Sequence, residues 1–277
     1  LQLVMTMRRF KAKVVVDIEG EQKSATLARL SGAGERIGPR RRHGQWLYTR
    51  QRQADWSGHR WQAYASLSCP AAKSPAHYLP LKDTVAGQDE ANRILEGAHK
   101  SDTLIVIHAG ATKTYKIWHA EQFAALCQRL RRAGLTPLLI GAGQKDRQQI
   151  ARIQSFLCEP VIDLCDQLSL NGLIALLKRS RGFVGNDSGP MHLAAACGLP
   201  TVALFGPTDD TLWQPLSPDA RVLRWQHCHK SCERCSCALD SYPCLQRITV
   251  DQVVNTLEEL GVIPLSHSGP VKTLRIS

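Results

Sequence analysis

The segment 181–207 holds the residues whose types and spacing best suit ligand binding. It consists of a short apolar run, a turn of sequence Gly-Asn-Asp-Ser-Gly, a compact helix and a second apolar run. Asp187 or Ser188 can cap the helix, because short polar side chains accept hydrogen bonds from first-turn amides. Pro190 suits the first turn, and Gly198 followed by a proline ends the helix. The pattern predicts a strand–helix–strand unit with a well-defined helix N-terminus.

This helix N-terminus is the predicted anion site. Between two buried parallel strands, such a helix points its N-terminus into the crevice beyond the carboxyl ends of the strands. Backbone N–H groups converge there, beside the positive end of the helix dipole. They belong to Ser188, Gly189, Met191 and His192, because Pro190 has no N–H. A diphosphate is the expected ligand. An ordinary capped helix with a structural histidine fits the same pattern.

The same segment carries a resemblance to a known family. The stretch is GNDSGPMHLAAACGLPTVALFGPTDD, with Trp213 and Pro215 after it. It resembles the nucleotide-sugar-binding motif of the bacterial lipopolysaccharide heptosyltransferases, glycosyltransferase family 9. The resemblance implies an α/β protein of the glycosyltransferase-B type, with two Rossmann-like domains built on parallel sheets, the N-terminal one truncated.

The resemblance also implies a reaction. It is an inverting transfer of heptose from ADP-heptose to a lipopolysaccharide inner-core acceptor of the Kdo–lipid A type, with no cofactor required for catalysis. Another nucleotide sugar fits the same motif, because a diphosphate site does not contact the sugar.

The spacing of apolar runs predicts the domain organisation. Beyond residue 102, strands and helices alternate, which is typical of a right-handed, parallel, doubly wound sheet. The predicted strands cover 103–109, 136–140 and 161–164, and the predicted helices cover 119–132, 145–157 and 171–178. We assign 1–98 to a partial acceptor-side domain, 99–248 to a donor-binding domain, and 249–277 to a C-terminal helix and tail.

The acceptor-side domain is expected to combine strands and helices as well. Residues 13–18 (KVVVDI) indicate a buried strand, and 21–30 indicate a helix. Residues at helical spacing indicate an amphipathic segment over 61–67, and a short helix is expected over 89–98.

The loop 108–118, HAGATKTYKIW, follows the first strand of the donor domain. By resemblance, Lys116 matches a family lysine that contacts the donor phosphate, and Lys113 is the weaker candidate. A lysine there would provide a mobile positive charge for a departing diphosphate. Thr112 could add a hydroxyl donor.

Two aspartates complete the expected donor site. Asp146 follows the Gly-rich turn GAG, where the family carries an acidic residue that binds the nucleotide ribose; a solvated start of a helix is the alternative. Asp187 suits a helix cap, and its carboxylate would repel a diphosphate unless it points away.

The strand–loop–helix at 13–30 resembles a family segment that ends in Gly-x-x-Lys-Ser. By that match, Lys23 and Ser24 would face the cleft between domains, although an exposed first-turn lysine is the alternative. The family's proposed catalytic base is an aspartate in a Gly-Asp turn after the first strand, and no such turn precedes Leu1.

Asp17 and Glu19, at the end of a predicted strand, are substitute candidates for this base, and Lys23 is a further catalytic candidate. We therefore expect this exact chain to transfer sugar poorly or not at all. A catalytically silent nucleotide-sugar-binding protein is an alternative function.

Five cysteines form a cluster with the spacing C-x3-C-x2-C-x-C-x6-C. They are Cys228, Cys232, Cys235, Cys237 and Cys244. Thiolates at such spacing could hold a structural zinc ion or an iron–sulfur cluster. A local disulfide or free thiols remain alternatives.

Charge and composition limit the partners. The 277 residues carry a net charge of +11. Basic residues crowd the first quarter, at Arg36, Arg40, Arg41, Arg42, His43, Arg50, Arg52 and Arg60. No nucleic-acid motif accompanies them, so we expect an anionic inner-membrane surface or a phosphorylated substrate instead. The chain begins with Leu and shows no secretory signal or spanning apolar run, so a cytoplasmic protein, peripheral at the inner membrane, is expected.

Overall fold

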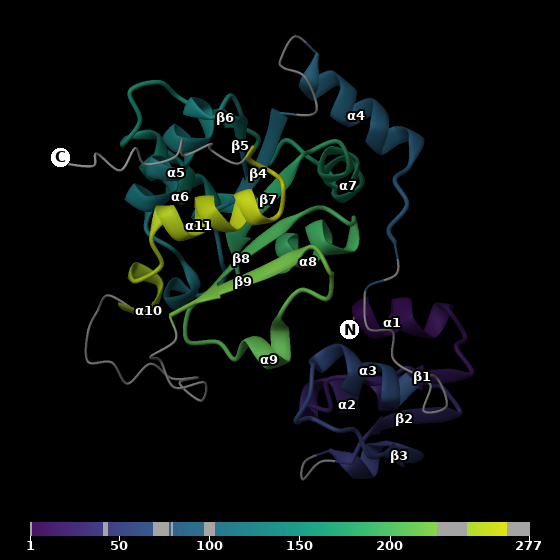
Figure 1. Cartoon of the computed structure of the whole chain (residues 1–277). Helices are drawn as coiled ribbons and strands as arrows, with labels where there is room; N and C mark the ends of the chain where they lie inside the picture. Colours follow the sequence, from purple (N-terminus) through teal and green to yellow (C-terminus); the bar gives the residue numbers. More distant parts are fainter. Residues whose placement is uncertain are drawn as a thin grey trace, which may run out of the picture. The chain divides into compact units, whose positions relative to one another are not determined.

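A computed structural model describes residues 2–40, 44–68, 78, 80–96, 103–225 and 243–264 (Figure 1). The chain divides into two compact units, one made of Leu1–Pro75 with Thr211–Trp213 and the other of Ala76–Asp210 with Gln214–Ser277. Both contain parallel sheets, which confirms the predicted fold class.

The first unit contains a three-stranded parallel sheet in the order β1-β2-β3. Its strands are β1 (Val14–Val16), β2 (Glu35–Pro39) and β3 (Arg50–Arg52). Its helices are α1 (Gln2–Arg9), α2 (Gln22–Leu30), the 3-10 turn η1 (Gln45–Leu47) and α3 (Arg60–Ser68). A small core forms where α2 packs on η1, through Ala25, Ala28, Leu47 and Tyr48.

The second unit contains a six-stranded parallel sheet in the order β6-β5-β4-β7-β8-β9. Its strands are β4 (Leu104–His108), β5 (Thr136–Ile140), β6 (Ile162–Asp163), β7 (Gly182–Asn186), β8 (Thr201–Phe205) and β9 (Ala220–Arg224). This confirms the doubly wound parallel sheet. The order reverses between β4 and β7, and ligands bind beyond the carboxyl ends of the strands at such a switch point.

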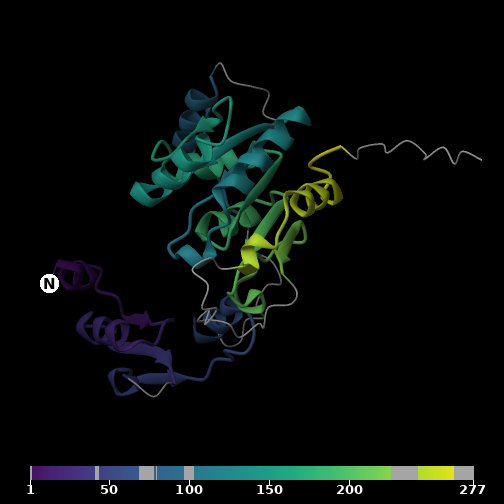
Figure 2. The same ribbon diagram turned by 90° about the vertical axis from the view of Figure 1, so that its left-hand side faces the viewer.

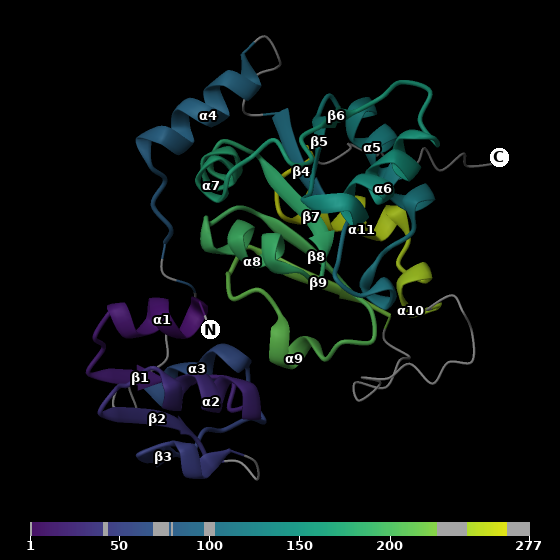
Figure 3. The same cartoon turned by 180° about the vertical axis from the view of Figure 1, so that it is seen from behind.

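Helices cover both faces of the six-stranded sheet (Figures 1 and 2). One face carries α5 (Ala120–Arg132), α6 (Gly143–Gln154) and α11 (Val250–Glu259), and the other carries α7 (Leu170–Lys178) and α8 (Gly189–Ala196). The remaining helices are α4 (Val85–Leu95), the 3-10 turn η3 (Thr114–Lys116), α9 (Asp210–Trp213) and α10 (Pro243–Gln246). Ile105 and Ile107 of β4 join the core formed with α5, α6 and α11. Because strand side chains alternate, Leu104 and Val106 face the opposite side, where α7 and α8 lie (Figure 3).

Helix α4 begins four residues before the predicted start at 89. Thr84 caps it by accepting a hydrogen bond from the Gly87 amide at 3.1 Å. The helix packs along α7 (Figure 3). The compact units divide before α4, between Pro75 and Ala76, whereas the assigned domains meet after it, at residues 98 and 99. Those domain bounds stay a prediction.

A helix can cross a membrane only if it is long and apolar enough. Among the residues described, every helix is too short or too polar to cross a bilayer.

Candidate functional site

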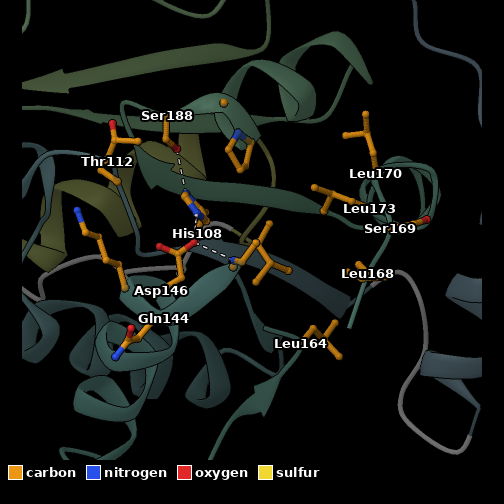
Figure 4. A pocket seen from close by; sticks show the side chains of 17 residues that line it. His108, Thr112, Gln144, Asp146, Leu164, Leu168, Ser169, Leu170, Leu173 and Ser188 are labelled. Atoms are coloured by element: carbon orange, nitrogen blue, oxygen red, sulfur yellow. Dashed lines mark hydrogen bonds and ion pairs between the residues drawn. The ribbon is translucent and has the colours of Figure 1, made fainter. Parts of the chain in front are cut away.

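A pocket of about 750 Å³ opens at the carboxyl ends of β4, β5 and β7 (Figure 4). The strand ends, with the loops and first helical turns that follow them, contribute His108, Ala111, Thr112, Ile140, Gly141, Ala142, Gln144, Lys145, Asp146, Ser188, Gly189 and Pro190. Leu164, Leu168, Ser169, Leu170 and Leu173 form its other wall. The pocket therefore combines a polar end at the switch point with an apolar end.

The N-terminus of α8 forms part of the polar end, as the sequence predicts. Ser188 is the N-cap residue, and Pro190 lies in the first turn. The predicted side-chain cap is wrong: within the described residues, Ser188 makes no capping hydrogen bond, because its hydroxyl contacts the Asn186 carbonyl at 3.0 Å. A Cβ built on Gly189 would meet no atom within 4 Å among the residues described. The start of α8 thus faces open space in the pocket.

His108, at the end of β4, links two groups that line the pocket (Figure 4). Its Nδ1 lies 2.9 Å from the Ser188 hydroxyl, and its Nε2 lies 3.4 Å from the Asp146 carboxylate. The Ser188 hydroxyl donates its one hydrogen to the Asn186 carbonyl, so the Nδ1–H of His108 donates to the Ser188 oxygen, and an imidazolium donates through Nε2–H to Asp146 as well. His108 begins the loop 108–118 but was not predicted as a site residue, because a single histidine at a strand end does not by itself indicate a ligand-binding role.

Asp146 lines the pocket, but its carboxylate is held by the protein. It accepts a hydrogen bond from the Ala142 amide at 2.9 Å besides its contact with His108. A side chain on Gly110 would collide with this carboxylate, so the close approach requires glycine. Burial raises the pKa of Asp146, but the hydrogen bonds from His108 and Ala142 and the charge of His108 lower it overall. The ribose-binding role of Asp146 stays a prediction.

Lys116 and Asp187 form an ion pair beside the pocket. The Lys116 Nζ donates to Asp187 Oδ2 at 2.6 Å, and only 6% of the Asp187 side chain is exposed. The expected capping role of Asp187 is therefore wrong, since its carboxylate binds a lysine instead. Lys116 does not line the pocket as Thr112 does, among the residues described. The amino group of Lys116 is instead held by Asp187, the residue directly before the N-cap of α8.

Asn186 is the residue that fixes this arrangement. It is fully buried at the end of β7. Its Nδ2 donates to the Ala109 carbonyl at 2.9 Å, and its Oδ1 accepts from the Trp118 amide at 3.1 Å. Trp118 is buried and donates through its indole to the Ile248 carbonyl at 3.0 Å. The loop that carries Lys116 is thus tied at both ends to the core.

His192 and Met191 occupy the first turn of α8. The His192 Nδ1 lies 2.6 Å from the Tyr78 hydroxyl, and the two rings meet edge to face at 6.0 Å. The Met191 side chain is fully buried, so only its amide is a candidate for anion binding. The predicted phosphate contacts of both residues stay predictions.

The two candidates in the first unit differ in burial. Asp17 is 7% exposed and accepts hydrogen bonds from the Tyr48 hydroxyl at 2.7 Å and from the Gly20 amide at 3.1 Å. Its carboxylate therefore stabilises the turn after β1. Lys23 is exposed in the first turn of α2, next to Ser24, which forms a capping box with Glu21.

The cysteine cluster falls largely outside the described residues, which contain neither Cys228 nor Cys232, Cys235 or Cys237. Cys244 is buried on α10. In the described ranges, no three His, Cys, Asp or Glu side chains form a group that could hold a metal ion. Metal binding by the cluster stays a prediction.

Comparison with known proteins identifies the family. The family model described as glycosyltransferase family 9 (heptosyltransferase) matches residues 1–243. Because this match spans most of the chain, the protein belongs to glycosyltransferase family 9. The family resemblance that the motif carries is thereby confirmed.

Individual relatives are more distant. Lipopolysaccharide heptosyltransferase 3 of Escherichia coli is 26% identical over 222 residues, which cover 78% of this chain and 65% of that protein. Lipooligosaccharide heptosyltransferase 2 of Campylobacter jejuni subsp. jejuni serotype O:6 is 26% identical over 191 residues, which cover 67% of this chain and 59% of that protein. The chain spans less than two thirds of the length of these curated relatives.

Solved structures share the fold. The structure of E. coli ADP-heptose LPS heptosyltransferase II matches with a TM-score of 0.78 at 23% identity, covering 94% of this chain and 79% of that chain. An E. coli heptosyltransferase solved with ADP matches with a TM-score of 0.67 at 20% identity, covering 93% and 77%. These matches confirm a fold of the glycosyltransferase-B type.

Proposed function

We propose that the second unit binds a nucleoside-diphosphate sugar and that the protein transfers heptose from ADP-heptose to a lipopolysaccharide core acceptor, with inversion. One observation carries this proposal: the pocket joins an apolar wall to the start of α8 at the switch point of the sheet. A nucleotide needs this combination, because its base is apolar on both faces and its diphosphate is anionic. The names of the relatives, which include an ADP-heptose enzyme and a complex with ADP, support the choice of donor.

We assign the parts of the donor as follows. The base packs against Leu168, Leu170 and Leu173, while the diphosphate oxygens accept hydrogen bonds from the first-turn amides of α8 and from the Thr112 hydroxyl. Lys116, which pairs with Asp187 directly before the N-cap residue of α8, exchanges part of this pairing for a phosphate oxygen. Positive charge at this point favours departure of the diphosphate when the glycosidic bond breaks.

Transfer also requires a base that takes the proton of the acceptor hydroxyl while its oxygen bonds to the anomeric carbon. Asp17 is a candidate for this base in the described residues. Its two oxygens already accept hydrogen bonds from the turn and from Tyr48, which supports a second candidate function, the binding of a nucleotide sugar without transfer.

The acceptor defines the proposed location. A phosphate-rich glycolipid lies at the inner leaflet, so we place the protein in the cytoplasm, peripheral at the inner membrane. The net charge of +11 supports contact with an anionic surface.

Titration calorimetry with ADP and a transfer assay with ADP-heptose test these functions. Binding with turnover supports the transferase, and binding without turnover supports the silent binder. Absence of ADP binding by the folded chain contradicts both. Comparing Asp17→Asn with the unaltered chain then tests the base, because a base variant loses turnover while it retains ADP affinity.

A further inference from the structure

The apolar wall of the pocket depends on the start of α7. Leu170 and Leu173 lie on the first turn of this helix, and both line the pocket with the N-cap residue Ser169 (Figure 4). The Ser169 hydroxyl accepts a hydrogen bond from the Gly172 amide at 3.1 Å. Whatever fixes Ser169 therefore also fixes the two leucines.

Glu90 of α4 holds Ser169 through both carboxylate oxygens. The Ser169 amide donates to Glu90 Oε1 at 2.7 Å, and the Ser169 hydroxyl donates to Glu90 Oε2. These two hydrogen bonds, first from the side chain and then from the backbone of Ser169, lower the pKa of Glu90. The carboxylate also lies at the positive end of the α7 dipole, where a negative charge is stabilising. A residue of α4 thus completes the cap of α7.

Helices α4 and α7 pack closely against each other around this contact. A Cβ on Gly172 would lie 2.5 Å from the Glu90 carboxyl carbon, and a Cβ on Gly87 would lie 2.5 Å from the Asn171 carbonyl oxygen. Glycine is required at Gly87, where the atom met belongs to the backbone, whereas at Gly172 the Glu90 side chain would have to move. Towards the other end of α7, Lys178 pairs with Asp83, which precedes α4, at 2.9 Å. The segment 83–95, which contains α4, therefore contacts α7 near both of its ends.

We propose that Glu90 is a positioning residue for the nucleobase of the donor. By fixing Ser169, it places Leu170 and Leu173 against the base, while the diphosphate end of the pocket, built on α8 and the loop after β4, does not depend on it. The inference rests on the proposed donor function.

The test uses the full 277-residue chain and two probes, ADP and inorganic pyrophosphate. ADP affinity is measured by calorimetry, and pyrophosphate affinity by competition with ADP. We expect Glu90→Ala to weaken ADP binding about tenfold, since two charge-assisted hydrogen bonds are lost, and to leave pyrophosphate binding unchanged. Glu90→Gln keeps one carbonyl oxygen as an acceptor and should lie between Glu90→Ala and the unaltered chain. Asp89→Ala removes a neighbouring exposed carboxylate of the same helix and should change neither affinity.

Thermal unfolding of each variant accompanies the titrations. If Glu90→Ala does not fold, the ADP and pyrophosphate affinities of Glu90→Gln test the inference instead. Unchanged ADP affinity in the Glu90 variants overturns the inference, and so does an equal loss for both probes, which indicates a general structural role. A folded, unaltered chain that binds neither probe overturns the proposed donor function, and the inference with it.

Discussion

Lys116 controls the balance of charge at the start of α8. Its Nζ lies 2.6 Å from Asp187, whose carboxylate is almost fully buried. An unpaired carboxylate at this point would repel a diphosphate and would be costly to bury. Lys116 is therefore expected to affect both the free energy of unfolding and the affinity for the diphosphate. Mutations can separate these two effects.

We expect Lys116→Met to lower the free energy of unfolding by about 2 kcal/mol, because it leaves a buried carboxylate without its cation. ADP affinity should fall more than about tenfold, since the same carboxylate then faces the phosphates. Chemical denaturation and titration calorimetry measure the two effects.

Lys113→Met is the matched control, because Lys113 is an exposed lysine of the same loop. It should change neither quantity. The double variant Lys116→Met/Asp187→Asn should recover most of the stability and, because the repelling carboxylate is also removed, part of the ADP affinity of the unaltered chain. Unchanged ADP affinity in Lys116→Met would contradict the assigned role.

Asp146 makes stability depend on pH. Its pKa in the folded chain is lowered from the ordinary value of 3.8 by the hydrogen bonds from His108 and Ala142, which outweigh the effect of burial. Because the folded pKa is the lower one, the carboxylate stabilises the fold at neutral pH. This contribution is lost as the pH falls from the ordinary value through the folded value.

Unfolding free energies at several pH values test this dependence. Between about pH 5 and about pH 3, the unaltered chain should lose more stability than Asp146→Asn, which has no proton to take up. Equal losses in the two chains would show that the pair with His108 does not stabilise the fold.

At the scale of elements, the start of α8 is exposed to the pocket rather than blocked by its own side chains. Gly189→Ala adds a methyl group in open space, so stability should stay within about 0.5 kcal/mol of the unaltered chain. ADP affinity should fall about tenfold, because the methyl group keeps phosphate oxygens from the amides.

Gly34→Ala is a suitable control for Gly189→Ala. A Cβ at Gly34 also meets no atom within 4 Å in the part of the chain that the structure describes, but this glycine belongs to the first unit. Calorimetry and thermal unfolding of both variants are compared. If Gly189→Ala binds ADP as well as Gly34→Ala does, the diphosphate does not lie at the start of α8.

Sequence patterns predicted most of the second unit because those elements are locally marked, whereas β9, α9 and α10 were not predicted. Strand β4 is a continuous apolar run, and α11 begins with a capping box at Thr249. Strands β2 and β3 were missed, because ERIGP contains glycine and proline and RQR is polar. Strand β2 forms by pairing with β1, and β3 forms by pairing with β2, which no local pattern records.

The candidate site was predictable only where a motif marks it. The α8 turn and Lys116 were anticipated, and they lie side by side through the Asp187 pair. His108 and the apolar wall of the pocket were not predicted, because their proximity depends on the order of the strands and on the packing of α7. Glu90 and Ser169 are 79 positions apart, and no spacing rule links them.

At the scale of the whole molecule, the net charge of +11 suggests how a glycolipid acceptor is approached. We expect the chain to co-sediment with phosphatidylglycerol vesicles at about 50 mM salt and to be released at about 500 mM, because screening shortens the range of surface charge. Phosphatidylcholine vesicles are the control. Absence of binding to anionic vesicles at low salt, or equal binding to both lipids, would contradict membrane contact.

The crystal structure of the chain with ADP bound is the most direct test of the donor site. We expect the diphosphate at the amides of residues 188–192, near the Lys116 amine, and the adenine against Leu168, Leu170 and Leu173. ADP bound elsewhere, or a diphosphate held away from the start of α8, would contradict the proposed site.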